Sequence, residues 1–364
     1  MRSAERVAVI GTGLIGTSIA MAGARAGDQV RGFDADPDAL SRAVERAGLT
    51  PATDLDECVR GATIVFVCTP IPVVGGLVVE ALGLAPDAVV TDVASVKSHV
   101  MVEVESRVRV DGLRRYVGGH PMGGSERSGP DHASPSVLDG VVWVLTPAEP
   151  SDDASLARLE GWVSRVGARP IRMDAERHDR LVAMVSHLPQ VASTALMGLA
   201  AREEAGEPEI LLLAAGGFRD LTRLAASNPH LWSDILLANG AAIGRAIDLY
   251  VERLEALRDL VVAEDGGGVE SAFAEAKTAR LQLAAKPQVR AGVAVLQVPV
   301  PDRPGVLAEL TSTMGEAQVN IEDLQIVHSP EGGRGTVHLT VAVDTVEAAE
   351  RALHERWFES TRLA

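Results

Sequence analysis

A short apolar run that leads into a glycine-rich turn constrains the fold of this chain more than any other feature. Residues 6–10 read Arg-Val-Ala-Val-Ile, and residues 11–16 read Gly-Thr-Gly-Leu-Ile-Gly. A buried strand, a GxGxxG turn and a helix in this order are typical of the first βαβ unit of a Rossmann-type domain. The three glycines allow a tight turn, close approach of a pyrophosphate to the backbone, and close packing of the helix on the strand.

The alternation of apolar runs and amphipathic segments continues to about residue 170 and predicts an α/β domain over residues 1–172. The runs are nearly continuous in hydrophobicity, as expected for strands covered on both faces. Strands are expected at residues 6–10, 29–33, 63–68, 88–91, 115–117 and 141–145, and helices at 15–26, 37–47, 73–82, 97–108 and 153–166.

Residues 173–286 predict a second domain that is all helix. Several helix faces are apolar at once, which favours burial between two subunits and therefore a homodimer. Residues 216–223 are expected to join two helices, and residues 264–268 to form a turn. Helices are expected at 178–201, 207–215, 221–226, 231–262 and 271–284.

Residues 287–364 predict a third, smaller domain. The order of expected elements is βαββα with a weak final element, which is a ferredoxin-like half-sandwich. The expected strands are 293–300, 320–328 and 335–343, the helices are 304–315 and 346–354, and a turn is expected at 329–333.

Charge and cysteine content exclude several classes of protein. The chain has 34 basic and 50 acidic side chains and a net charge of −16, which disfavours binding to nucleic acid or to an anionic membrane surface. Its two cysteines, Cys58 and Cys68, predict neither a disulfide scaffold nor a zinc site, so no metal is expected. No apolar run reaches 18 residues and no signal peptide is visible, so a cytoplasmic location is expected.

An acidic residue favours one dinucleotide over another. Asp34 ends the second expected strand, where a carboxylate accepts hydrogen bonds from the ribose hydroxyls and repels a 2′-phosphate. The pattern predicts NAD rather than NADP. Arg31 is close enough in sequence to reach a phosphate and weakens this preference, and a tight turn without any ligand is the alternative interpretation.

Two polar segments follow expected strands, where ligands bind in doubly wound sheets. One is residues 91–97, with Ser95 and Lys97, and the other is residues 118–124, with His120 between glycine and proline. Ser95 could instead cap the next helix beside a solvated Lys97, and His120 could be a surface histidine.

Two segments of the helical region also contain candidate site residues. Residues 186–190 read Ser-His-Leu-Pro-Gln inside a helical run, where a proline costs about 3 kcal/mol unless the kink has a use. Residues 216–223 contain Arg219 and Arg223, a concentration of positive charge in an acidic chain and a candidate anion site. An ordinary kinked core helix and an exposed loop arginine are the alternatives.

Taken in order, these segments resemble the prephenate dehydrogenase family, which includes arogenate and cyclohexadienyl dehydrogenases. The set comprises the glycine turn, D-x-x-S-V-K at 92–97, GGHPMGG at 118–124, SHLPQ at 186–190, and GGFRDLTR at 216–223 with Asn228-Pro229 and Trp232 after it. The tail, with Pro-Asp-Arg-Pro-Gly at 301–305 and Val-Asn-Ile at 319–321, is similar to an ACT domain.

The resemblance implies an NAD-dependent oxidative decarboxylation of prephenate to 4-hydroxyphenylpyruvate in tyrosine biosynthesis, with tyrosine as the expected effector of the ACT domain. It makes His120 the base, Ser95 its orienting partner, and His187 a neighbour of nicotinamide and substrate. Arg223, Gln190, Ser186 and Trp232 are the implied substrate-binding residues. The implied cofactor-binding residues are Gly11, Gly13, Leu14, Ile15, Gly16, Asp34 and Thr69, and the effector-binding residues are Gly305, Asn320 and Ile321.

One position departs from the family pattern. Some members have a second histidine where this chain has Gln190, and glutamine cannot move a proton. The neutral side chain favours prephenate, whose side chain has a keto group, over arogenate, whose side chain has an ammonium group. Arogenate dehydrogenase remains an alternative, as do a reductase similar to β-hydroxyacid dehydrogenases and a non-catalytic sensor of nucleotide and amino acid.

Overall fold

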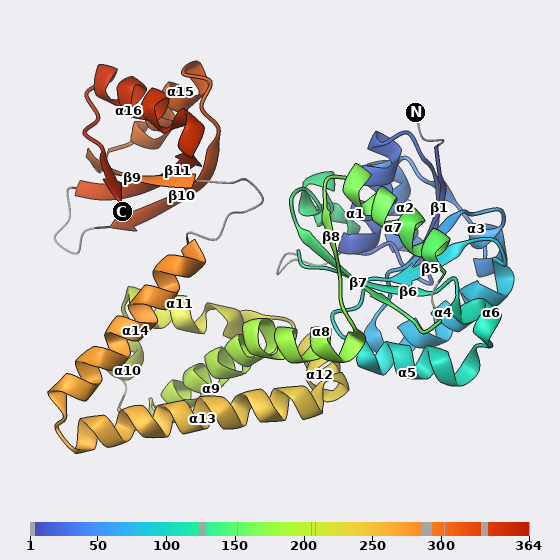
Figure 1. Cartoon of the computed structure of the whole chain (residues 1–364), viewed down its shortest axis with the longest axis horizontal. Coiled ribbons are helices and arrows are strands. Elements are labelled where there is room, and N and C mark those ends of the chain that lie inside the picture. Colours follow the sequence, from blue (N-terminus) through green and yellow to red (C-terminus); the bar gives the residue numbers. More distant parts are fainter. Residues whose placement is uncertain are drawn as a thin grey trace. The chain divides into compact units, whose positions relative to one another are not determined.

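The protein is described from a computed structural model and falls into two compact units, residues 1–256 and 257–364 (Figure 1). Each unit is considered by itself. Gly124, Asp302, the expected turn at 329–333 and the expected domain boundary at 286–287 lie outside the described residues. The structure describes residues 4–123, 129–150, 152–204, 206–207, 209–284, 293–301, 303–328 and 334–363.

The first unit begins with a parallel sheet of order β3-β2-β1-β4-β5, as the glycine turn predicts. Ala8 and Ile10 pack on one face of it and Val7 and Val9 on the other, so both faces are buried. The expected elements are present to within a few residues, but the two-residue β3 and the short α3 and α6 were not predicted. The strands are β1 (Arg6–Ile10), β2 (Gln29–Phe33), β3 (Thr50–Pro51), β4 (Ile64–Val67) and β5 (Val89–Asp92); the helices are α1 (Leu14–Arg25), α2 (Pro37–Ala47), α3 (Leu55–Val59), α4 (Ile71–Leu84), α5 (Ser98–Arg107) and α6 (Val110–Leu113).

A second sheet of three strands continues from the first through a bridge between Val90 and Tyr116. β6 pairs antiparallel with β7, which pairs parallel with β8. The strand expected at 115–117 lies instead at 117–121, so His120 lies within a strand and not beyond its end. The elements are β6 (Val117–Pro121), η1 (Pro130–His132), η2 (Pro135–Val137), β7 (Val142–Pro147), α7 (Asp153–Arg165) and β8 (Arg169–Arg172).

The rest of the first unit is helical; helix α13 runs across the boundary between the units, and α14 belongs to the second unit. The segment 216–223 is not a loop, because α11 and the start of η4 occupy it. The run expected at 231–262 is broken at Asn239, and α14 already begins at Gly266 inside the expected turn. The helices are α8 (Ala175–Val182), the π turn η3 (Ala183–His187), α9 (Leu188–Glu203), α10 (Glu209–Leu212), α11 (Gly216–Thr222), η4 (Arg223–Ala226), α12 (Pro229–Ala238), α13 (Gly240–Val262) and α14 (Gly266–Ala284).

One continuous helical run, from Ala175 to Glu203, is long and apolar enough to cross a membrane by length and composition alone. It consists of α8, η3 and α9, and a third of its most apolar window is buried inside the protein. Core helices of soluble proteins meet the same criterion. This run also contains His178 and Asp179, which hydrogen-bond to β6 and to the start of α5.

The second unit contains a four-stranded antiparallel sheet of order β10-β11-β9-β12. Helices α15 and α16 lie on one face of it, where Leu296, Leu310 and Leu339 are buried in a common core (Figure 1). The short strand β12 follows the last expected helix and was not predicted. The elements are β9 (Val293–Pro301), α15 (Val306–Glu316), β10 (Ile321–His328), β11 (Arg334–Ala342), η5 (Val343–Thr345), α16 (Val346–Glu355) and β12 (Thr361–Leu363).

Candidate active site

The glycine turn between β1 and α1 leaves backbone open to a ligand. Gly11 has φ +90°, and a Cβ there would lie 2.6 Å from the backbone oxygen that follows β4. A Cβ on Gly16 would lie 1.9 Å from the Gly11 carbonyl oxygen. By contrast, nothing in the described chain lies within 4 Å of a Cβ built on Gly13, the N-cap of α1. The first amides of α1, from Leu14 and Ile15, therefore adjoin a space suited to a pyrophosphate.

Asp34 is fixed against this turn. Its Oδ2 accepts hydrogen bonds from the Thr12 N–H at 2.6 Å and the Thr12 hydroxyl at 3.0 Å, and its Oδ1 accepts from the Asp36 N–H at 2.9 Å. The carboxylate thus stands where a ribose is bound in dinucleotide folds. The Arg31 guanidinium donates to the Glu57 carbonyl at 2.5 Å, so it is engaged at α3.

Thr69 supports the same assignment. It follows β4, beside Gly11, and its Oγ1 is buried without a hydrogen-bond partner in the described residues. A buried hydroxyl of this kind needs a partner, which a bound ligand can supply. The residues around the glycine turn therefore fit a dinucleotide.

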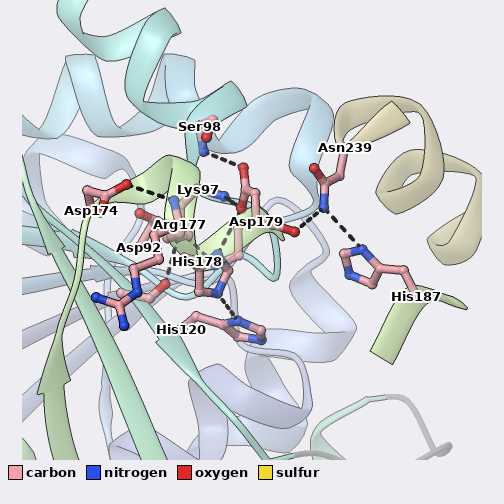
Figure 2. A network of polar contacts seen from close by, with 12 residues as sticks. Asp92, Lys97, Ser98, His120, Asp174, Arg177, His178, Asp179, His187 and Asn239 are labelled. Carbon is pink, nitrogen blue, oxygen red and sulfur yellow. Dashed lines mark hydrogen bonds and ion pairs between the residues drawn. The ribbon is translucent and has the colours of Figure 1, made fainter. Parts of the chain in front are cut away.

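A series of hydrogen-bonded side chains links β6 to α8 (Figure 2). Nδ1 of His120 lies 2.8 Å from Nε2 of His178, and Nδ1 of His178 lies 2.8 Å from Oδ1 of Asp179. His178 and Asp179 are buried, whereas His120 is half-buried. His120 was predicted from the sequence, whereas its two partners, His178 and Asp179, were not.

The Asp179 carboxylate also caps helix α5. Its two oxygens accept the backbone N–H groups of Lys97 and Ser98, each at 2.8 Å. The N-cap residue of α5 is Lys97, which makes no side-chain cap of its own. The alternative in which Ser95 caps this helix is therefore wrong. Ser95 lies half-buried in the connection between β5 and α5.

A buried ion pair lies behind the strand that contains His120. The Lys97 side chain is 1% exposed; it pairs with Asp92 and donates to the Gly119 carbonyl at 2.6 Å. The Tyr116 hydroxyl donates to the second Asp92 oxygen at 2.8 Å. Lys97 is thus not solvated, contrary to the alternative interpretation. Because Gly119 immediately precedes His120, the ion pair positions the backbone of the candidate base.

Burial and charge set the protonation of this network. Burial lowers the pKa of His120 well below its usual value; the charge of Lys97 and any protonation of His178 or His187 lower it further, whereas Asp179 opposes the shift. Burial alone would raise the pKa of Asp179, but hydrogen bonds from His178 and two backbone amides hold that pKa below its usual value. At neutral pH the site therefore contains a neutral His120 and an ionised Asp179.

The π turn η3 positions His187. It lets the helix continue into α9, where Pro189 occupies the first turn and its missing N–H costs little. The helix therefore contains a π turn at this point, and not an ordinary proline kink. Nδ2 of Asn239 lies 3.2 Å from His187 Nδ1, and the Trp232 ring meets the imidazole edge-on at 6.0 Å between centroids. Burial lowers the pKa of His187 to about 4, so its ring is neutral.

Gln190 holds the segment that contains Arg223. Its Nε2 donates to the Leu224 carbonyl at 2.8 Å, and its Oε1 accepts from the Ser227 hydroxyl at 3.3 Å. Leu224 belongs to η4, which begins at the exposed Arg223. Ser186 lies half-buried in the π turn. The buried amide of Gln190 is thus engaged with η4.

The expected effector residues lie in the second unit. Gly305 is the exposed N-cap of α15 at φ +89°, with nothing within 4 Å of a built Cβ in the described chain. Asn320 precedes β10, which begins at Ile321, and its Nδ2 donates to Glu322 at 2.9 Å.

A parallel sheet with an open glycine turn, an acid beside that turn and a neutral histidine on the adjoining sheet together define a dinucleotide-dependent dehydrogenase. Family models extend this. They match the prephenate dehydrogenase nucleotide-binding domain at residues 19–172, the prephenate dehydrogenase dimerization domain at 174–275, and the ACT domain at 294–358.

Known proteins agree with these matches. The chain is 32% identical to the cyclohexadienyl dehydrogenase of Zymomonas mobilis over 79% of this chain and 98% of that protein, and 29% identical to the prephenate dehydrogenase of Bacillus subtilis over 97% and 96%. A crystal structure of Aquifex aeolicus prephenate dehydrogenase with hydroxyphenyl propionate and NAD+ matches with a TM-score of 0.72 and 28% identity, over 78% of this chain and 99% of that one. The chain belongs to the prephenate dehydrogenase family and has a C-terminal ACT domain. It is an NAD-dependent oxidoreductase.

Proposed function

We propose that the chain converts prephenate to 4-hydroxyphenylpyruvate in tyrosine biosynthesis. The observation that supports this most is the neutral His120, whose pKa is lowered by burial and which is held on β6 by the Lys97 contact to Gly119. A histidine that stays neutral near pH 7 can accept a hydroxyl proton, and this transfer is typically worth about 10²–10⁴-fold in rate.

The proposed reaction needs no reactant other than the substrate and NAD. NAD, when bound along the glycine turn, supplies the acceptor for the hydride that leaves C4 of the substrate ring. His120 takes the C4 hydroxyl proton as that hydride leaves. The ring carboxylate then departs as carbon dioxide and leaves its bonding electrons in the ring. The resulting aromatic oxygen recovers the proton from His120.

The remaining site residues bind and orient the substrate in this proposal. Ser95 shares the hydrogen bond of the substrate hydroxyl with His120. Because an Asn239 amide proton points to Nδ1 of His187, the neutral ring of His187 bears its hydrogen on Nε2 and can donate it to bound ligands. Arg223 pairs with a substrate carboxylate through its planar guanidinium, and Trp232, which packs on His187, supports this arrangement.

The choice of prephenate over arogenate rests on Gln190. An arogenate site should offer a carboxylate to the ammonium group, because a buried ammonium without a partner is costly. Gln190 is neutral, and its described partners, Leu224 and Ser227, are neutral as well. The test is the ratio of kcat/KM for prephenate and arogenate with NAD. We expect this ratio to favour prephenate. A ratio that clearly favours arogenate would mean that arogenate is the substrate.

The ACT domain argues against a reductase similar to β-hydroxyacid dehydrogenases, and the site argues against a non-catalytic sensor. A sensor has no use for a neutral histidine that is held between a buried ion pair and the hydrogen-bonded side chains of helix α8. Absence of NADH formation from both prephenate and arogenate would favour these alternatives.

The assembly is proposed to be a homodimer. The region matched by the dimerization model exposes large apolar side chains: Leu212, Leu213 and Leu237 are each about four-fifths exposed in the single chain. Such surfaces are typical of subunit interfaces. Sedimentation equilibrium should give twice the chain mass, and a monomer at micromolar concentration would contradict the proposal.

The ACT domain is proposed to bind tyrosine at Gly305, Asn320 and Ile321 and to mediate feedback. The exposed N-cap of α15 and the start of β10 offer backbone groups to an amino acid. We further propose a cytoplasmic enzyme with domain boundaries after residues 172 and 286.

A further inference from the structure

We infer that His178, fixed by Asp179, is a positioning residue that selects the protonated nitrogen of His120; the inference rests on the proposed role of His120 as base. His178 lies between a carboxylate and the imidazole of His120, with both contacts at 2.8 Å (Figure 2). Each of these two hydrogen bonds requires one hydrogen atom. The contact with Asp179 determines which nitrogen of each ring carries that atom.

The ionised Asp179 can only accept, so Nδ1 of His178 donates to it. A neutral His178 then has a lone pair at Nε2, and this atom accepts the Nδ1–H of His120. The neutral His120 ring in turn has its lone pair at Nε2, where a substrate hydroxyl proton can be taken up. In the opposite arrangement, a cationic His178 would donate to His120 and leave a hydrogen on Nε2 of the base.

We take His178 to be neutral in this proposal, because the contacts around it can all be made without a second buried cation. Its ring is 1% exposed, and Lys97 already places a buried cation in the same network. The Asp179 carboxylate is stabilised by two backbone amides of α5, so it does not require a cationic partner. A neutral His178 satisfies the Asp179 oxygen with its Nδ1–H alone, so no second cation has to be desolvated beside Lys97.

The same geometry supports the base after proton transfer. A protonated His120 donates its Nδ1–H to His178, and the chain of hydrogen bonds ends on the negative charge of Asp179. The charged groups that face His120 from the elements around it are Lys97 and Asp92 behind β6 and Asp179 on α8, with the titratable rings of His178 on α8 and His187 in η3.

The direct test is nitrogen NMR of the full-length enzyme labelled with ¹⁵N-histidine, without substrate. The ring resonances of His120 are assigned by their absence in His120→Asn. We expect the hydrogen on Nδ1 in the unmodified enzyme near pH 7.5. A hydrogen on Nε2 would overturn the inference. This measurement needs no substrate, so it is independent of whether prephenate is the substrate.

Two variants separate positioning from folding. In His178→Gln the Oε1 atom can still accept from His120, whereas His178→Phe removes the acceptor. We expect kcat to fall less than about tenfold in His178→Gln and about 10²-fold in His178→Phe, with NAD affinity unchanged in both. Equal losses in the two variants would contradict the inference.

The pH profile of kcat/KM gives a further readout. Removal of a neutral acceptor leaves the acid limb in place or moves it to lower pH, whereas removal of a cation would move it to higher pH. An upward shift in either variant would show that His178 is charged and would overturn the inference. If the unmodified enzyme oxidises neither prephenate nor arogenate, the proposed function fails while the NMR result stands.

Discussion

The side-chain amide of Gln190 donates to the backbone carbonyl of Leu224 at 2.8 Å, so helix α9 holds the 3-10 turn that begins at Arg223. Gln190→Met keeps the size of the side chain but leaves that carbonyl without its donor. A lost partner of this kind costs about 1–3 kcal/mol, and we expect the KM for prephenate to rise about tenfold. Steady-state kinetics with saturating NAD measure this.

Two further variants show how large the change in KM should be if the site is disrupted more, or not at all. Arg223→Ala should raise the same KM by more than Gln190→Met does, because it removes the proposed carboxylate partner itself. Arg219→Ala, in α11 of the same motif, is the matched control and should leave KM within about twofold of the parent. If Gln190→Met and the parent have the same KM, the hydrogen bond to Leu224 does not position the substrate site.

Cofactor preference should depend on the charge of Asp34. Asp34→Asn keeps an oxygen for the Thr12 amide but loses the negative charge. Hydrogen bonds to a charged group are worth about 1.5–3 kcal/mol, so NAD affinity should fall roughly tenfold to hundredfold. NADP affinity should rise because the repulsion of its 2′-phosphate is relieved. Equal use of NAD and NADP by the parent enzyme would refute this role.

Activity should persist at a lower pH than an ordinary histidine allows. A histidine acts as a base only in its neutral form, and burial lowers the pKa of His120 well below 6.5. The acid limb of kcat/KM, which reports the free enzyme, should therefore lie below pH 6.5. His120→Asn should lose about 10²-fold or more in kcat with NAD affinity intact. A limb at or above pH 6.5, or normal turnover in this variant, would exclude His120 as the base.

Stability should depend on the ion pair between Lys97 and Asp92. Lys97→Met leaves the buried carboxylate of Asp92 without its cation. Breaking such a pair costs about 3–5 kcal/mol of the free energy of unfolding, measured by urea denaturation. The double variant Lys97→Met, Asp92→Asn removes both charges and should recover part of the loss. A single variant as stable as the parent would show that the pair makes no net contribution.

Feedback should depend on the C-terminal unit. Asn320→Ala should leave kcat and KM unchanged without tyrosine and weaken inhibition by tyrosine. A chain that ends at residue 286 should remain active but should no longer be inhibited by tyrosine. Coupling is reciprocal, so prephenate should alter tyrosine affinity in the intact enzyme. Identical responses in the parent and both altered proteins would place the effector elsewhere.

The Rossmann elements could be predicted because local pattern and tertiary role agree there. The Asp36 carboxylate and Pro37, for example, start α2 at the predicted residue. The displacement of β6 to residues 117–121 was not predictable from propensity, because glycines are poor strand formers. A Cβ at Gly119 would lie 2.6 Å from the Asp92 carbonyl oxygen, so tertiary packing requires a glycine within this strand.

The candidate site was predicted only in part, for a similar reason. His120 stood out because it lies between glycine and proline, whereas His178 and Asp179 lie in an ordinary amphipathic helix. The residues that they contact lie 58 and 82 positions away in the sequence. A local sequence pattern cannot predict contacts between residues so far apart. The break at Asn239 was also missed, although its buried amide joins the Asp179 carbonyl to His187.

The π turn at Ala183–His187 has a consequence for how the gene can change. A π turn holds one residue more than an α-helix needs to cover the same span. Deleting one residue between 183 and 186 would therefore let the run close as a regular α-helix while the residues after the deletion keep their angular position around the helix axis. His187 would then stay near Asn239, and Gln190 near η4. In α8, where the helix has no extra residue, a single in-frame codon deletion would instead rotate everything after it by roughly 100° and should separate both pairs.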